Sequence, residues 1–237
     1  MKFLIFQHIS CEHPGIFRTF FEEGGISWHA VQLDAGDAIP DLKDFDALWV
    51  MGGPMDVWDT DTCPWLVAEK EAIRTWVQDL KKPYLGLCLG HQLLADALDG
   101  KCEVQDTPEI GILDVHLTDA AHNDPLMQGL TPQMKCLQWH SVAVTQPPTG
   151  AELLASSPDC TWQAMRVGKR AWGIQFHVEL QDQTISEWSE VPAYAAALDK
   201  VKGPGALKVM EDEALQYMPQ FKDNARLLFD NFCQSMG

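Results

Sequence analysis

The sequence predicts an α/β fold: an open, mostly parallel sheet with helices on both faces and a small antiparallel extension. Over the first hundred residues, short apolar runs alternate with segments of helical periodicity, the order that builds a parallel sheet covered by helices. The apolar runs lack polar alternation, which is typical of strands buried on both faces. After Lys101 the pattern changes to short strand-like pieces between turns, which indicates the antiparallel extension.

The elements of the parallel part follow from these patterns in chain order. Gly24 and Gly25 end the first predicted helix, because glycine readily adopts the backbone conformation that follows a helix. The second helix is predicted from apolar residues that recur at helical spacing. The expected elements are strand 2–7, helix 16–23, strands 27–33 and 47–51, helix 65–80, a short strand that ends at Cys88, and a helix from Gln92 to Gly100.

The second part of the chain is predicted to form hairpins and then helices. Gly168 and Lys169 are expected to form one hairpin turn, and the run Gly203–Gly205, which contains Pro204, separates the last two helices. The expected strands are 102–104, 111–117, 135–139, 142–144, 152–155, 163–167 and 171–176, followed by helices 184–202 and 207–234.

Length and composition favour one globular domain and exclude several function classes. The 237 residues, 46% hydrophobic and 22% charged, suit a single α/β domain over 1–237 with a helical tail from about 184. A net charge of −17 argues against partners such as nucleic acid or an anionic membrane. No run approaches the length of a transmembrane helix. Neither metal-ligand spacing nor a nucleotide-binding glycine pattern occurs, so we expect no metal and no cofactor.

Cysteine usage indicates a reducing compartment. The chain has seven cysteines, an odd number, and none forms a Cys-x-x-Cys pair. This pattern predicts neither a disulfide framework nor a zinc site, and it suits a cytoplasmic protein.

Cys88 is the candidate nucleophile. It follows a buried strand and precedes a helix, with Gly86 two residues before it and Gly90 two residues after it. This is the strand-to-helix elbow that exposes a nucleophile, with cysteine in place of serine. The following helix points its N–H groups at the sulfur and favours a thiolate. The alternative is an ordinary buried cysteine between turn glycines.

Two further segments could complete an acyl-transfer site. His177 and Glu179 follow a buried strand and would project to one side in an extended backbone, so the carboxylate could orient the imidazole as a base. A surface pair is the alternative. The glycines Gly52 and Gly53 follow another buried strand, where a backbone N–H could stabilise an oxyanion together with the N–H of Leu89. A plain turn is the alternative there.

A family resemblance becomes specific at three strings. They are Gly-Gly-Pro-Met-Asp at 52–56, Gly-Leu-Cys-Leu-Gly-His-Gln at 86–92 and Gly-Ile-Gln-Phe-His-Val-Glu at 173–179. Their order and spacing resemble those of class I (triad-type) glutamine amidotransferases, and most closely the free-standing members that are similar to the amidotransferase domain of GMP synthetase. The run Cys-Glu-His-Pro-Gly at 11–15 and the run Gln-Trp-His-Ser at 138–141 also fit the resemblance.

The resemblance implies a flavodoxin-like open sheet and assigns roles to the residues that match. Cys88, His177 and Glu179 would form the catalytic triad. The family usually has proline between the histidine and the glutamate, whereas this chain has Val178. The oxyanion donors would be Gly53 and Leu89, and the substrate contacts would come from Gly52, Gln92, His140, Ser141 and Val142.

The expected reaction is hydrolysis of the glutamine side-chain amide through a cysteine thioester, which gives glutamate and ammonia. A separate ammonia-accepting synthase could be the partner. One alternative is a γ-glutamyl peptidase that acts on γ-glutamyl peptides or glutathione-type conjugates with the same residues. A second is a non-catalytic regulatory protein on the same scaffold, against which the complete set of Cys88, His177 and Glu179 speaks.

Overall fold

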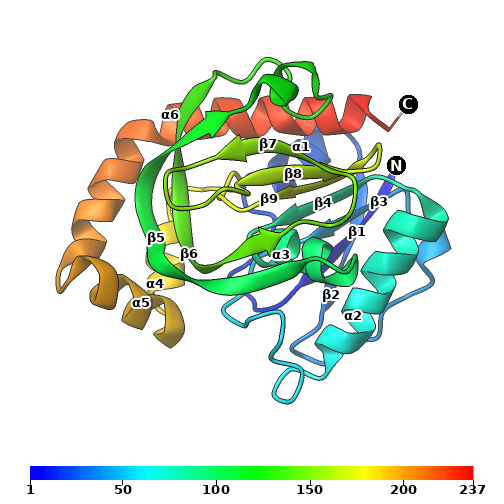
Figure 1. Cartoon of the computed structure of the whole chain (residues 1–237), viewed down its shortest axis with the longest axis horizontal. Coiled ribbons are helices and arrows are strands. Elements are labelled where there is room, and N and C mark those ends of the chain that lie inside the picture. Colours follow the sequence, from blue (N-terminus) through cyan, green and yellow to red (C-terminus); the bar gives the residue numbers. More distant parts are fainter. Residues whose placement is uncertain (237) are drawn as a thin grey trace.

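The computed structural model of the protein describes residues 1–236 and confirms the predicted α/β architecture. Within these residues, one nine-stranded sheet runs in the order β2-β1-β3-β4-β9-β8-β7-β5-β6 (Figure 1). The first five strands of this order are parallel, and the other four join them antiparallel. The strands are β1 (Lys2–Gln7), β2 (Ser27–Gln32), β3 (Ala47–Val50), β4 (Tyr84–Leu87), β5 (Lys101–Leu117), β6 (Gln133–Gln146), β7 (Ala151–Ser156), β8 (Ala164–Val167) and β9 (Ala171–Ile174).

Helices pack on both faces of the parallel strands, as predicted. One face is covered by aromatic residues of α1 and α6, such as Phe17 and Phe229, and the other by apolar residues of α2 and α3, such as Ile73 and Leu93. The helices are α1 (Phe17–Glu23), α2 (Trp65–Arg74), which continues as the π-helical turn η2 (Thr75–Leu80), α3 (Leu89–Ala97), α4 (Thr184–Ser189), α5 (Pro192–Lys202) and α6 (Ala206–Gln234), with short 3-10 turns η1 (Leu42–Asp44) and η3 (Asp119–Asn123).

Four predicted elements have the wrong bounds. The pieces 102–104 and 111–117 belong to one strand, β5, and 135–139 and 142–144 to another, β6, because the two strands pair along their length across a register shift. The helix expected from Gln92 begins at Leu89, directly after the elbow. The helix expected over 184–202 is two helices, α4 and α5. Pro192 disfavours helical backbone at the residue before it, Val191, which is extended.

The long helix α6 joins the two parts of the molecule. Its first half packs through Met210 and Met218 on the β5–β6 extension, and its second half packs through Phe229 and Phe232 on the parallel sheet. The helix changes direction along its length (Figure 1), and Pro219 lies inside it, between the two halves. Among the described residues, no helix is both long enough and apolar enough to cross a membrane.

Candidate active site

The backbone at Cys88 is strained in the way that an exposed nucleophile requires. Cys88 has φ +50° and ψ −104°, a conformation that residues with a side chain rarely adopt. Its N–H donates to the carbonyl oxygen of Ile174 at 2.8 Å, which ties the turn to β9. A Cβ at Gly86 would lie 2.3 Å from the carbonyl oxygen of Gly90, and a Cβ at Gly90 would lie 2.1 Å from that of Val50. Only glycine fits at either position.

His177 and Glu179 form the pair that the sequence predicts. His177 Nδ1 and Glu179 Oε1 are 2.7 Å apart, and both side chains are buried. The N–H of Val178 donates to Glu179 Oε2 at 2.8 Å, a hydrogen bond that proline at this position would not make. The His177 N–H donates to the carbonyl of Leu137 at 2.9 Å, and Trp188 packs against the imidazole edge-on, with ring centroids 4.4 Å apart. The imidazole is therefore fixed in position from several sides.

The electrostatics of this pair favour an imidazolium facing the Cys88 sulfur. Burial acts to lower the pKa of His177, but the charges of Glu179 and Cys88 and the hydrogen bonds to both raise it well above its ordinary value. Burial likewise acts to raise the pKa of Glu179, yet His177 and the backbone N–H groups hold it below its usual range. The carboxylate can thus orient and stabilise a charged imidazole beside the thiol.

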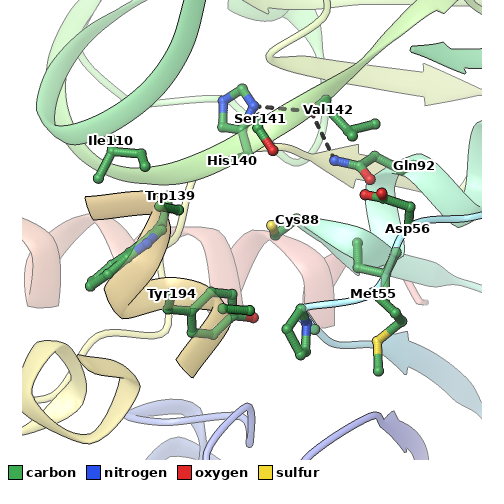
Figure 2. Close-up of a pocket in the computed structure, with 15 residues that line it drawn as sticks. Met55, Asp56, Cys88, Gln92, Ile110, Trp139, His140, Ser141, Val142 and Tyr194 are labelled. Atoms are coloured by element: carbon green, nitrogen blue, oxygen red, sulfur yellow. Dashed lines mark hydrogen bonds between the residues drawn. The ribbon is translucent and has the colours of Figure 1, made fainter. Parts of the chain in front are cut away.

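Cys88 opens into a cavity of about 200 Å³ (Figure 2). Seven of the predicted site residues line this cavity, and they come from three separate segments of the chain. Gly52, His177 and Glu179 are buried and do not line this cavity in the part of the chain that the structure describes. The predicted residues in the lining are Gly53, Cys88, Leu89, Gln92, His140, Ser141 and Val142.

The two predicted oxyanion donors meet at this cavity. A Cβ at Gly53 would come within 3.0 Å of the Leu89 side chain, so these residues are neighbours in space. Within residues 1–236, neither the N–H of Gly53 nor that of Leu89 has a hydrogen-bond acceptor. Unengaged N–H groups beside a nucleophile are the donors that a developing oxyanion needs.

Gln175, which sequence reasoning missed, links Cys88 to the opposite cavity wall. Its Nε2 lies 3.6 Å from Cys88 Sγ, and its Oε1 accepts from Gln92 Nε2 at 3.1 Å. Gln92 Nε2 also donates to the carbonyl of Val142 at 3.0 Å, so this amide is used to hold the wall in place (Figure 2). Gln175 precedes His177 by two residues, so the two side chains lie on the same side of the extended backbone. This spacing is the signal in the sequence that could have indicated Gln175.

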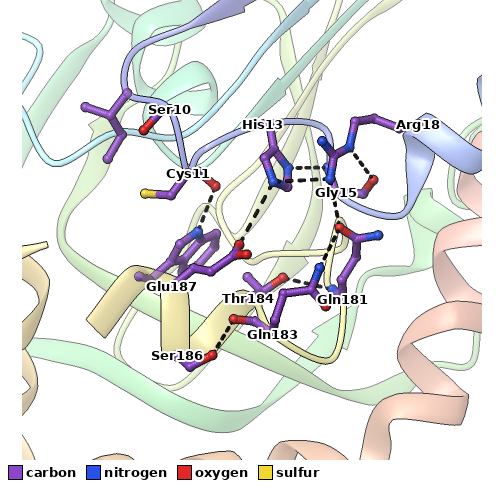
Figure 3. Close-up of polar contacts among 12 residues, drawn as sticks. Ser10, Cys11, His13, Gly15, Arg18, Gln181, Gln183, Thr184, Ser186 and Glu187 are labelled. Atoms are coloured by element: carbon purple, nitrogen blue, oxygen red, sulfur yellow. Dashed lines mark hydrogen bonds and ion pairs between the residues drawn. The ribbon is translucent and has the colours of Figure 1, made fainter. Parts of the chain in front are cut away.

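The loop 8–15 is clamped onto the segment that follows Glu179 (Figure 3). Arg18 Nη2 donates to Gln181 Oε1 at 3.0 Å, and Trp188 Nε1 donates to the carbonyl of Cys11 at 3.2 Å. Gly15 has φ +50°, and a Cβ there would lie 1.7 Å from the carbonyl oxygen of Glu179. His8, at the start of this loop, is fully buried between the Gly52 carbonyl at 2.7 Å and Glu69 at 2.9 Å.

This clamp places a second buried carboxyl group, Glu12, beside the pair. Glu12, His177 and Glu179 bring ligand-type atoms within 4.8 Å of one another. Tyr194 on α5 donates to Glu12 Oε1 at 2.5 Å and also lines the cavity, whereas Glu12 Oε2 has no hydrogen-bond partner in the described chain. Burial raises the pKa of Glu12 from 4.5 to about 7, with a further rise from Glu179 and opposing effects of His177, Tyr194 and His8.

Replacing Glu12 with glutamine is expected to make the protein more stable at alkaline pH. Because the folded state raises the pKa of Glu12, the stability that its neutral form contributes is complete below about pH 4.5 and is lost as pH rises through about 7. The Glu12→Gln variant keeps a neutral acceptor for Tyr194. At about pH 8 it should exceed the wild type by up to about 3 kcal/mol in unfolding free energy, and at about pH 5 by much less.

Denaturant unfolding of both proteins at the two pH values measures this difference. The exposed Glu71 on α2 gives the matched control, since Glu71→Gln should change stability equally little at both values. A difference between Glu12→Gln and wild type that stays constant with pH would show that Glu12 ionises normally.

Two groups of described side chains bring metal-ligand atoms together. The first group is Glu12, His177 and Glu179. The hydrogen bond between His177 and Glu179 explains why these two side chains lie together, so no ion is needed to hold them. The other group is Glu109, His140 and Cys160, which lies next to the cavity wall.

The cavity also has lining residues for which the sequence predicted no role. Trp139 and Tyr194 form an aromatic wall opposite Cys88, and Asp56 places a carboxyl group on the glycine-rich side (Figure 2). Tyr194 belongs to the helical tail, whose pattern carried no functional signal. The remaining unpredicted lining residues are Pro54, Met55, Ile110, Ala193 and Ala197.

Solved structures share this fold over nearly the whole chain. A glutamine amidotransferase from Thermotoga maritima superposes with a TM-score of 0.86 at 24% identity, and the match covers 98% of this chain and 97% of that one. A glutamine amido transferase from Methylobacillus flagellatus gives a TM-score of 0.81 at 23% identity, covering 100% and 95%.

Sequence comparisons carry the family assignment. A glutamine-hydrolysing GMP synthase subunit from Sulfolobus acidocaldarius is 33% identical over 153 residues, which cover 64% of this chain and 77% of that protein. The glutamine amidotransferase-like protein YfeJ of Salmonella typhimurium is 32% identical over 186 residues, 75% of each chain. The family description "Glutamine amidotransferase class-I" matches residues 16–187. The chain therefore belongs to the class-I glutamine amidotransferase family.

Proposed function

We propose that the protein hydrolyses the side-chain amide of glutamine, with Cys88 as nucleophile, His177 as acid and base, and Glu179 as the group that orients His177. The observation that carries this proposal is a strained cysteine at a small cavity, with two unengaged backbone N–H groups beside it and a buried histidine–carboxylate pair whose imidazole interacts with the cysteine sulfur. The name of the Sulfolobus relative, which describes it as glutamine-hydrolysing, supports the same reaction.

In the first half of the reaction, the Cys88 thiolate attacks the amide carbon and forms a C–S bond. The carbonyl oxygen becomes an oxyanion that the N–H groups of Gly53 and Leu89 stabilise, each by about 3 kcal/mol. His177 then gives its proton to the nitrogen, the C–N bond breaks, and ammonia leaves.

In the second half, His177 takes a proton from water, and the resulting hydroxide attacks the thioester carbon. The C–S bond breaks, glutamate is released, and the thiolate–imidazolium pair is restored. Throughout both halves, the Glu179 carboxylate accepts a hydrogen bond from His177 Nδ1, which keeps its proton. This hydrogen bond directs the other ring nitrogen, Nε2, toward the sulfur.

The cavity wall suits the amino-acid end of the substrate. Asp56 supplies a carboxylate for the ammonium group, and the backbone of Ser141 and Val142 borders the same space. The aromatic wall of Trp139 and Tyr194 would pack against the substrate's methylene groups. The ammonia that is released would pass to an acceptor on a separate synthase chain, since the Sulfolobus relative is named as one subunit of a synthase.

A substrate panel tests the proposal. The purified protein should release ammonia and glutamate from glutamine in equal amounts and leave asparagine, which is one methylene shorter, intact. A glutamine-like electrophile should add once to the protein, as seen by intact mass. Cleavage of a γ-glutamyl dipeptide with glutamine left intact would instead favour a γ-glutamyl peptidase, and absence of both hydrolysis and adduct would contradict either enzyme function.

A further inference from the structure

The group of Glu109, His140 and Cys160 lies outside the catalytic centre and is not explained by the proposed reaction. Each residue offers one ligand atom, the three atoms lie within 4.8 Å of one another, and all three residues are buried. Glu109 and His140 are directly paired across β5 and β6, and a register shift in β5 immediately before Glu109 sets which way that residue faces. Cys160 comes from the loop between β7 and β8.

In its neutral form, His140 presents a lone pair on Nε2 to this group. His140 Nδ1 lies 3.0 Å from the carbonyl oxygen of Val142, and a carbonyl can only accept, so Nδ1 carries the proton. His140 Nε2 makes no hydrogen bond, although its side chain is 2% exposed and Glu109 Oε2 lies 3.2 Å away. Metal-binding histidines are typically fixed in this manner, with one nitrogen donating to a carbonyl and the other free to coordinate.

The spacing of the nitrogen and oxygen atoms fits a small tetrahedral ion. Bonds of about 2.0–2.2 Å at tetrahedral angles place neighbouring ligand atoms about 3.3–3.6 Å apart. The 3.2 Å between His140 Nε2 and Glu109 Oε2 is close to that edge length, and the pair lacks the alignment of a hydrogen bond. A cation between these two atoms would give His140 Nε2 a partner, while Glu109 Oε2 would keep its hydrogen bond from Gln163.

The surroundings supply support and access. Gln163 Nε2 donates to Glu109 Oε2 at 2.7 Å, while Gln163 Oε1 has no partner in the described chain. Ser157 Oγ accepts from the N–H of Cys160 at 3.1 Å and so holds the cysteine loop. A surface cleft of about 600 Å³, lined by 104–107, 143–145 and 158–162, reaches Cys160 from solvent.

From this arrangement we propose that Glu109, His140 and Cys160 form a binding site for a zinc ion behind the cavity wall. Nitrogen, thiolate and carboxylate together are a donor set that zinc accepts, and the fourth position is open to Gln163 Oε1 or to water. On binding, the Cys160 thiol gives its proton to solvent and the sulfur forms the metal bond. Because His140 also lines the Cys88 cavity, the ion would hold that wall against β5.

Cobalt(II) titration tests the site, since cobalt replaces zinc at such sites and gives a thiolate charge-transfer band. The titration uses the Cys88→Ala protein, so that the catalytic thiol cannot contribute. We expect a band that saturates at about one equivalent and disappears when zinc is added. Adding Cys160→Ser should remove the band, and adding Glu109→Gln should weaken cobalt binding at least about tenfold.

The matched control is Cys63→Ser, which replaces a partly exposed cysteine outside this group and should leave the titration unchanged. Unfolding midpoints of all variants without metal show whether each is folded. Absence of a band in folded Cys88→Ala protein would overturn the proposal, as would a band that survives Cys160→Ser. Both readouts are independent of glutamine hydrolysis.

Discussion

Replacing Cys88 with serine is expected to lower the kcat for glutamine hydrolysis by on the order of 10⁴-fold or more. Serine keeps the shape of the elbow, but its hydroxyl is far less acidic than a thiol, so His177 cannot hold it as an anion. The oxyanion donors and the cavity wall remain, and the affinity for glutamine should therefore change little. The measurement is steady-state kinetics of ammonia release, together with intact mass after treatment with the glutamine-like electrophile.

Cys63→Ser is the matched control for this experiment too, because Cys63 lies in the loop before α2 and does not line the Cys88 cavity in the described structure. It should retain wild-type activity and form the same adduct. If Cys88→Ser hydrolyses glutamine within about tenfold of the wild type, or still forms the adduct, Cys88 is not the nucleophile.

Replacing Gly90 with alanine is expected to destabilise the protein by about 3 kcal/mol or more. The added Cβ would lie 2.1 Å from the carbonyl oxygen of Val50 and 2.8 Å from its carbonyl carbon. Val50 cannot retreat, because it is paired with Phe6 on one side and with Gly86 on the other. Either α3 must move away from the sheet or the strand must break its pairing, and the Cys88 turn is lost in both cases.

Gly24→Ala is the control, since Gly24 also has negative φ and a Cβ there would come no closer than 3.2 Å to the carbonyl oxygen of Phe20. Denaturant unfolding should show a change below about 1 kcal/mol for this variant. If Gly90→Ala does not accumulate as folded protein, its loss of stability is even larger than predicted, which also supports the prediction. A Gly90→Ala protein as stable as Gly24→Ala would show that the helix and strand can separate without cost.

Local patterns were sufficient for much of the fold. The parallel strands β1, β3 and β4 read as apolar runs because they are buried on both faces, and the predicted strands 2–7, 27–33 and 47–51 match β1, β2 and β3 closely. For β5 and β6 the sequence predicts several pieces, because the register shifts between them interrupt the simple alternation of a strand, and β5 is also partly exposed. Where strands register with one another is decided by contacts that no local window contains.

Some residues of the candidate site are likewise encoded by local patterns, and others are placed only by tertiary packing. The elbow at Cys88 and the pair of His177 and Glu179 are encoded locally, by glycines at fixed offsets and by the two-residue period of a strand, and the structure places that pair 2.7 Å apart. Tyr194 gave no signal, because it reaches the cavity only through the docking of α5. Glu12 belongs to a run that fits the family, but its burial beside His177 depends on the clamp around loop 8–15.

The sequence by itself determined the α/β class, the alternation of strands and helices along the first part of the chain, and the residues of the elbow and the histidine–carboxylate pair. These features depend on backbone conformation and near-neighbour spacing, which a few adjacent residues specify. Only the tertiary structure decided which distant groups meet. Cross-strand register brings Glu109 opposite His140 and a loop adds Cys160 to them, while helix docking sets Tyr194 against Glu12. These long-range contacts result from the packing of whole layers of secondary structure, in which the position of each residue depends on many others.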